Sequence, residues 1–72
     1  MRYREVERKL RSLGCVNLSH KGTGSHRTWY NPAAKNTVPV TIPDWGSKDL
    51  KNGTLRAIVR QLELAWEDFN RA

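Results

Sequence analysis

Apolar residues recur every three or four positions near the beginning of the chain. Four residues follow this spacing: Tyr3, Val6, Leu10 and Leu13. The spacing is typical of the buried face of an amphipathic helix. Charged residues are expected to cover the other side of this helix: Arg4, Glu5, Arg8, Lys9 and Arg11. We expect the helix to end at Gly14, because glycine tolerates the left-handed backbone conformation that commonly follows a last helical turn.

Two segments after Gly14 have the pattern of a β-hairpin. In residues 15–21 (CVNLSHK), Val16 and Leu18 alternate with polar residues, which is typical of a strand. Residues 25–31 (SHRTWYN) are rich in aromatic and β-branched side chains, which favour strands. The small residues 22–24 between them predict a turn, because glycine adopts backbone conformations that other residues avoid.

A third strand is predicted for residues 37–42 (TVPVTI), after a longer connection that begins at 31–34. Strict alternation would give this strand a buried apolar face and a polar face. The apolar face consists of Val38, Val40 and Ile42, and the other of Thr37, Pro39 and Thr41. Because proline cannot donate a backbone hydrogen bond, Pro39 predicts an edge strand, or at least a position that faces solvent.

Helical spacing returns after a loop over residues 43–54 (PDWGSKDLKNGT). The second apolar face consists of Leu55, Ile58, Val59 and Leu62. Asn52 is the expected N-cap of this helix, because asparagine side chains bond to free backbone N–H groups at helix starts. Trp66 and Phe69 continue the apolar face, so we expect the end of the chain to fold back as a further helical turn.

The predicted order of elements is α-β-β-β-α, within a single domain over residues 1–72. A three-stranded antiparallel sheet with the helices on one face buries all the apolar stripes, so the predicted class is α+β. The opposite face of the sheet is left to solvent or to a ligand. On the second strand, alternation places Trp29 among the helices and Tyr30 on the same outer face as His26. Trp45 in the loop is expected to cap the core.

The amino-acid composition indicates a kind of binding partner and a cellular location. The 72 residues carry 13 Lys and Arg against 7 Asp and Glu, a net charge of +6. This excess favours a polyanionic partner, most often nucleic acid, because cations that neutralise phosphates release counterions. The single Cys15 excludes an internal disulfide and is expected to be a small buried apolar residue. No apolar stretch is long enough to span a membrane, so we expect a cytoplasmic protein that contacts no membrane.

Proton-transfer chemistry is suggested by His26, which follows the predicted turn. Histidine side chains titrate close to neutral pH and can both accept and donate a proton, but an exposed histidine after a turn is also an ordinary surface residue. The orientation of the His20 side chain depends on the register of the predicted hairpin. If the hairpin pairs around Thr23, His20 faces His26, whereas a shift of one residue sends the two side chains to opposite faces. A zinc site built from Cys15, His20, His26 and Asp44 is not expected, since their spacing matches no known ligand pattern.

Several motifs together resemble one protein family. They are the amphipathic first helix, GSH at 24–26, VTIP at 40–43, KNGTLRAIVRQL at 51–62 and EDF at 67–69. This combination, which extends from Tyr3 to Phe69, is similar to that of the HicA toxins, which are the toxins of type II toxin–antitoxin pairs. The resemblance implies a fold like that of double-stranded-RNA-binding domains, and an mRNA interferase that cuts mRNA with one histidine and without a metal or other cofactor. It also implies a HicB-type antitoxin as the protein partner.

Transferred residue by residue, the resemblance makes His26 the catalytic side chain and places Gly24 and Ser25 in the same motif. The chain departs from the family pattern where many relatives have a second histidine after the third strand, since Asp44 and Trp45 stand there. Glu63 stands where relatives often end the helix with glycine. His20 is a candidate auxiliary residue in place of the missing second histidine.

Binding of the RNA phosphates is expected from residues close to His26. The cationic candidates are Lys21, Arg27 and Lys48. Backbone N–H groups in the turn that contains Gly24 and Ser25 could also face a phosphate. The predicted function is therefore an endoribonuclease. The alternative is an RNA-binding module of the double-stranded type that cuts nothing, which would depend on lysine and arginine rather than on His26.

Overall fold

The computed structural model describes residues 1–19, 26–35, 38–44, 46 and 48–72. In chain order its elements are α1 (Tyr3–Ser12), β1 (Val16–Asn17), β2 (His26–Tyr30), β3 (Val40–Pro43), α2 (Asn52–Gln61) and α3 (Trp66–Arg71). The strands form an antiparallel sheet in the order β1-β2-β3. The structure thus confirms the predicted α+β class, with α3 as the expected helical turn at the end of the chain.

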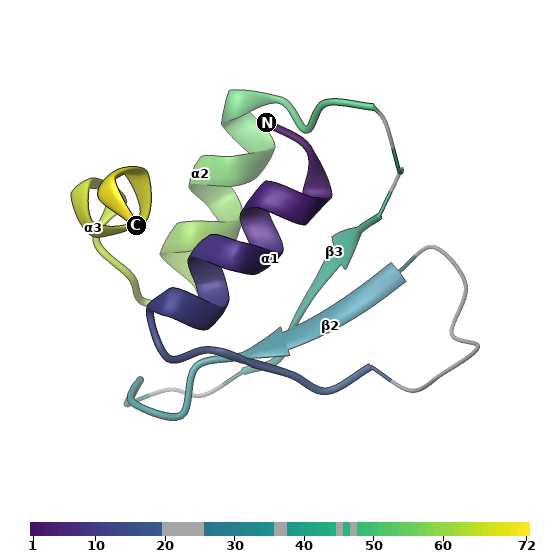
Figure 1. The fold of residues 1–72 in the computed structure, drawn as a ribbon. Helices are drawn as coiled ribbons and strands as arrows, with labels where there is room; N and C mark the ends of the chain where they lie inside the picture. Colours follow the sequence, from purple (N-terminus) through teal and green to yellow (C-terminus); the bar gives the residue numbers. More distant parts are fainter. Residues whose placement is uncertain (20–25, 36–37, 45, 47) are drawn as a thin grey trace.

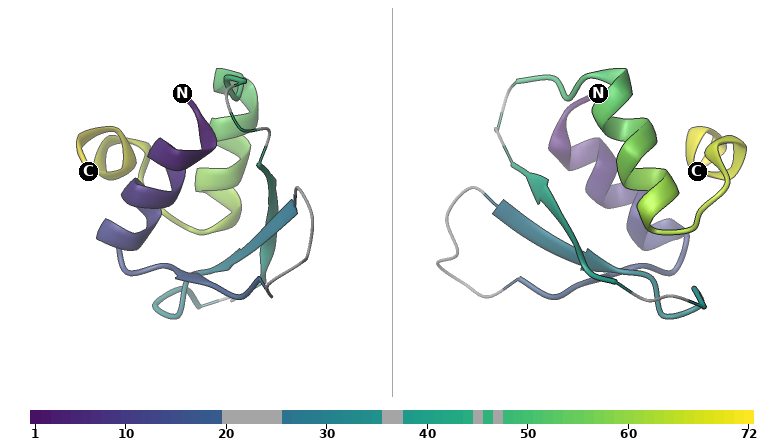
Figure 2. Two further views of the ribbon diagram at one scale, coloured as in Figure 1. Left: turned by 45° about the vertical axis from the view of Figure 1, so that its right-hand side comes forward. Right: turned by 180° about the vertical axis from the view of Figure 1, so that it is seen from behind.

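The molecule has two layers. In Figures 1 and 2, α1 and α2 lie side by side on one face of the sheet, and α3 packs beside them. No described element covers the opposite face of the sheet, which we call the outer face. None of the three described helices is long and apolar enough to cross a membrane.

The hydrophobic core lies between the helices and the sheet. Its fully buried side chains are Trp29, Phe69, Leu10, Ile42, Leu55, Leu62, Val6 and Val59. The indole Nε1 of Trp29 donates a hydrogen bond of 2.9 Å to the Tyr3 hydroxyl, so the largest core side chain leaves no polar atom unpaired. Trp29 therefore joins the middle strand to α1, and its predicted inward orientation is confirmed.

The register of the sheet decides which side chains face outward. Val16 pairs with Tyr30, and Asn17 pairs with Trp29, so Val16 shares the outer face with Tyr30. Val16 and Leu18 are 45% and 44% exposed. The alternation that predicted this strand therefore places its two aliphatic residues in solvent rather than in the core.

The third strand matches its prediction only in part. It lies at an edge of the sheet, as Pro39 predicted, and it buries Val40 and Ile42. Val38 was expected on the same buried face, but it is 64% exposed. The reason is that β3 begins only at Val40, so among the described residues Val38 has no ladder partner that would fix it against the helices.

Two helix ends have the same local structure. After α1, Cys15 N–H donates to the Leu10 carbonyl (2.9 Å), and Gly14, with φ +88°, occupies the left-handed position, as predicted. After α2, Leu64 N–H donates to the Val59 carbonyl (3.0 Å), and the left-handed position is held by Glu63, with φ 56°. A residue with a Cβ atom is strained in this conformation, unlike glycine.

Two expectations about the helices are wrong. Asn52 is the first residue of α2 and not its N-cap; the N-cap is Lys51, and no side chain caps this end. Lys9 was expected on the exposed side of α1, but it is buried at 6% exposure. Its Nζ donates to the backbone oxygens of Phe69 (3.2 Å), Asn70 (3.0 Å) and Ala72 (3.0 Å). Acceptor groups at the end of α3, 60 residues away in the sequence, therefore stabilise its charge.

Candidate functional site

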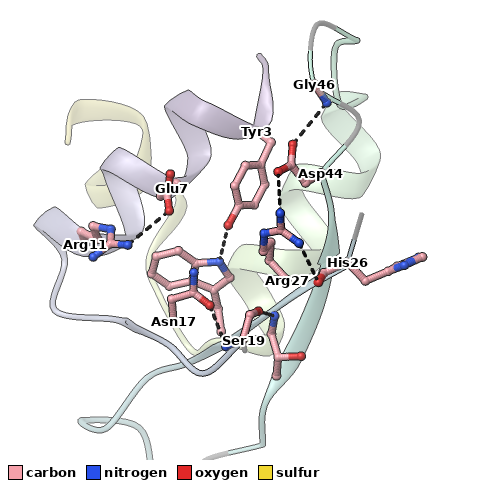
Figure 3. A network of polar contacts seen from close by, with 11 residues as sticks. Tyr3, Glu7, Arg11, Asn17, Ser19, His26, Arg27, Asp44 and Gly46 are labelled. Atoms are coloured by element: carbon pink, nitrogen blue, oxygen red, sulfur yellow. Dashed lines mark hydrogen bonds and ion pairs between the residues drawn. The ribbon is translucent and has the colours of Figure 1, made fainter. Parts of the chain in front are cut away.

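His26 is the first residue of β2, where it pairs with Pro43 at the end of β3. Its side chain is exposed. In Figure 3 the imidazole points away from Tyr3, Arg27 and Asp44 and into solvent. A ligand on the outer face of the sheet can therefore reach this ring without any rearrangement of the core.

The side chain of Arg27, the next residue, projects from the opposite side of the strand. It pairs with the buried Ile42, and its guanidinium Nη2 lies 3.5 Å from the Asp44 carboxylate. Arg27 Nη1 also donates a hydrogen bond of 3.3 Å to the carbonyl of His26. Asp44 in turn accepts a hydrogen bond of 3.2 Å from Gly46 N–H (Figure 3). These contacts connect the backbone of His26 to the segment that follows β3.

The side chains of this ion pair are 30% exposed for Arg27 and 25% exposed for Asp44. Partial burial makes the attraction between them stronger than that of a fully solvated pair. The sequence predicted Arg27 to be one of the RNA-binding residues next to His26. In the structure the two side chains lie on opposite faces of β2. The Arg27 guanidinium therefore does not face a phosphate that is bound at the His26 ring.

Tyr3 and Cys15 are the described groups with a perturbed pKa. Burial raises the pKa of the Tyr3 hydroxyl above its ordinary value of 10.0, although the hydrogen bond from Trp29 acts in the opposite direction. Burial also raises the pKa of the Cys15 thiol above its ordinary value of 9.0. Both groups therefore stay protonated at neutral pH. Cys15 is a buried core residue, as expected, and neither group is a candidate base.

The outer face around His26 combines polar and apolar side chains. Register places Thr28 opposite Thr41, and Tyr30 opposite Val16. Residues beyond β1 extend this face, because Leu18 N–H donates to the Thr28 carbonyl (2.7 Å) and Thr28 N–H donates to Ser19 Oγ (2.6 Å). The result is a surface that has His26 at one end of β2 and the exposed aliphatic side chains of Val16 and Leu18 along β1 and its continuation, next to Tyr30 and Thr28.

The other predicted site residues are only partly described. Lys21, Gly24, Ser25 and the auxiliary candidate His20 lie outside the described residues, as does Trp45. Lys48 is described and exposed; it precedes Asp49, which pairs with Arg2 in an antiparallel bridge. Within the described ranges, no group of three His, Cys, Asp or Glu residues could hold a metal ion.

A hollow that the sequence did not predict lies next to this site. It has a volume of about 400 Å³ and lies at the N-terminal end of α1. Its lining residues are Arg2, Tyr3, Arg4, Glu7, Asp44 and Gly46. The sequence contained only one signal for it, the arginines at the beginning of the chain, because the hollow forms when α1 meets the segment after β3.

Fold and site together define a small basic α+β protein whose sheet has one face that no described element covers, with an exposed histidine at the start of the middle strand. Over residues 3–64 the chain matches the family described as the HicA toxin of bacterial toxin–antitoxin pairs. The chain therefore belongs to the HicA toxin family, and the predicted resemblance is confirmed. Comparisons with curated proteins and with solved structures give no match.

Proposed function

We propose that this toxin of a toxin–antitoxin pair is an endoribonuclease that cleaves mRNA without a metal, with His26 as its catalytic side chain. The observation that carries the proposal is the position of His26. Its ring is exposed on the open face of the sheet, while its backbone is held by the β3 ladder and by Arg27. An accessible ring on a fixed backbone is the geometry that general acid–base catalysis requires.

The chemistry of RNA cleavage needs few groups. The 2′-hydroxyl loses a proton and attacks the adjacent phosphorus, and the 5′-oxygen leaves with a proton, so the product ends in a 2′,3′-cyclic phosphate. We propose that His26 carries one of these protons, which contributes about 10²–10⁴-fold to the rate. Stabilisation of the phosphate by Lys21 and by the turn that contains Gly24 and Ser25 is part of the same proposal. A second proton carrier at His20 is also part of it.

The direct test is incubation of the toxin with end-labelled single-stranded RNA in excess EDTA. We expect the cleavage rate in EDTA to equal the rate without EDTA, and we expect the products to have 2′,3′-cyclic phosphate ends. Intact RNA that is nevertheless bound would favour the alternative, a module that binds RNA and cuts nothing. Cleavage that stops in EDTA and returns with added Mg²⁺ would contradict the proposal.

We also propose that the antitoxin is of the HicB type and covers the outer face of the sheet. Two features support this position. Val16 and Leu18 are exposed apolar side chains on the same face as His26, and such side chains favour a protein partner. The net charge of +6 favours an acidic partner. In the complex we expect amide exchange to slow in β1 and β2. Protection confined to α2 and α3 would contradict this position.

A further inference from the structure

The eight arginines of this chain differ in the groups that they contact. Three of them form ion pairs with carboxylates: Arg11 with Glu7 (3.2 Å), Arg27 with Asp44 (3.5 Å) and Arg71 with Asp68 (3.3 Å). Arg56 stacks on the ring of Trp66 at 4.3 Å. Arg2 precedes α1, and Arg4 and Arg8 lie in its first two turns; all three are exposed, and, as for Arg60 on α2, no ion pair joins them to a described carboxylate. We call these three residues the α1 arginines.

The surroundings of the α1 arginines are electropositive. Arg2 and Arg4 line the hollow of about 400 Å³ together with the carboxylates of Glu7 and Asp44. Each of these carboxylates is already paired, with Arg11 and Arg27 respectively. On the adjoining surface the α1 arginines surround one further carboxylate, that of Glu5. Three guanidinium groups therefore face one acidic group that has no ion pair among the described residues.

The hollow lies close to the catalytic end of β2. Its wall includes Asp44, which pairs with Arg27, and Arg27 in turn is bonded to the backbone of His26. Figure 3 shows the contact between Asp44 and Arg27 and the contact between Arg27 and the backbone of His26. His26 points to the outer face, whereas the α1 arginines belong to the helix layer. The edge of the sheet at the end of β3 separates the two surfaces.

We infer that the α1 arginines bind the phosphate backbone of an RNA strand that passes over this edge to the His26 site. An RNA partner is favoured over a protein partner because the described part of this surface is charged and exposes no large apolar side chain. The large apolar side chains that are exposed in the described part of the chain are Val16, Leu18 and Val38, and none of them lines the hollow. Protein interfaces usually have an apolar core, whereas phosphate recognition depends on arginine and lysine.

This inference rests on the proposed ribonuclease function, but it can be tested separately by binding. The test variant is Arg4→Gln with Arg8→Gln. The control is Arg60→Gln with Arg71→Gln, which removes the same charge from the C-terminal turns of α2 and α3. Both are made in a His26→Ala background, so that labelled single-stranded RNA is bound without being cut. Circular dichroism checks that each variant is folded.

We expect the test variant to bind RNA about tenfold more weakly. The slope of log affinity against log salt concentration should fall by about 0.7 for each phosphate contact that is lost. The control should match the parent in both quantities, and Arg4→Lys with Arg8→Lys should keep most of the slope. With His26 intact, the test variant should raise KM and leave kcat within about twofold.

Three results would overturn the inference. The first is an unchanged affinity and salt slope in a folded test variant. The second is an equal loss of RNA affinity in the control variant, because RNA binding would then depend on surface charge in general and not on the α1 arginines. The third is unchanged RNA binding together with weakened antitoxin binding, which would assign the α1 arginines to the protein partner. A parent toxin that binds RNA through the α1 arginines but never cuts it would contradict the proposed function and leave this inference standing.

Discussion

The two sides of β2 differ in what holds their side chains. On the helix-facing side, Trp29 is fully buried and bonded to Tyr3, and Arg27 is paired with Asp44. On the outer side, His26 is exposed and Thr28 and Tyr30 are partly exposed. Side chains that alternate along a single strand thus belong either to the core or to a surface that no described element covers.

This difference separates stability from activity. Core side chains on the helix-facing side are constrained by packing, so a change there is felt throughout the fold. Outer side chains contribute little burial, so their identity is available for chemistry and for partners. The Arg27–Asp44 pair lies at the boundary, because it belongs to the helix-facing side but contacts the backbone of His26. Substitutions on the two sides should therefore have different signatures.

The largest expected effect comes from the helix-facing side. Trp29→Ala removes the central core side chain and the indole donor to Tyr3. We expect it to lower the free energy of unfolding by about 3–5 kcal/mol, which is a large part of the stability of so small a protein. Its outer neighbour is the control, since Tyr30→Ala should cost about 1 kcal/mol or less. Urea titration followed by circular dichroism measures both; equal losses would remove the distinction between the two sides.

A smaller effect is expected at the boundary. Arg27→Gln and Asp44→Asn should each lower stability by about 1 kcal/mol, and the double variant should cost less than the sum of the two, because the ion pair between them is lost in all three variants. The salt dependence of RNA binding should be the same in both single variants. If Arg27→Gln alone flattened that dependence while Asp44→Asn did not, Arg27 would be an RNA-binding residue, as the sequence suggested, rather than a support for His26.

The smallest effect sharpens the comparison within the helix layer. Glu63→Gly should raise stability by about 0.5–1 kcal/mol, because it relieves a left-handed conformation at the end of α2. At the equivalent position after α1, Gly14→Ala should lower stability by about 1 kcal/mol. Thermal unfolding measures both changes, and cleavage by Glu63→Gly should stay at the wild-type rate. A loss of stability in Glu63→Gly would show that contacts of the glutamate side chain outweigh the backbone strain.

Much of this architecture follows from local sequence patterns. The spacing of Tyr3, Val6 and Leu10 predicted α1, and the position of Gly14 predicted its end. Alternation placed Trp29 inside the fold, and Pro39 placed β3 at an edge. Each of these inferences depends only on neighbours within a few residues, where helical and strand periodicity act directly on side-chain burial.

What could not be predicted depends on partners that are distant in the sequence. The burial of Lys9 requires the end of α3, 60 residues away. The buried side chain of Asn31 donates a hydrogen bond of 2.6 Å to the carbonyl of Leu62, 31 residues away. The pairing of Arg27 with Asp44 depends on the β2–β3 register. Within the candidate site, the sequence suggested His26 through a motif. Strand alternation places Arg27 on the opposite face, but its pairing with Asp44 depends on the structure.

The central claim is that His26 performs chemistry on the outer face without supporting the fold. The most direct measurement is single-turnover cleavage of labelled RNA by His26→Ala in EDTA, with urea unfolding of the same preparation and Thr41→Ala as a control on the exposed outer side of β3. We predict that His26→Ala slows cleavage by at least about 100-fold and changes stability by no more than about 0.5 kcal/mol. Thr41→Ala should match the wild type in both. A folded His26→Ala protein that cleaves RNA at the wild-type rate would contradict the account.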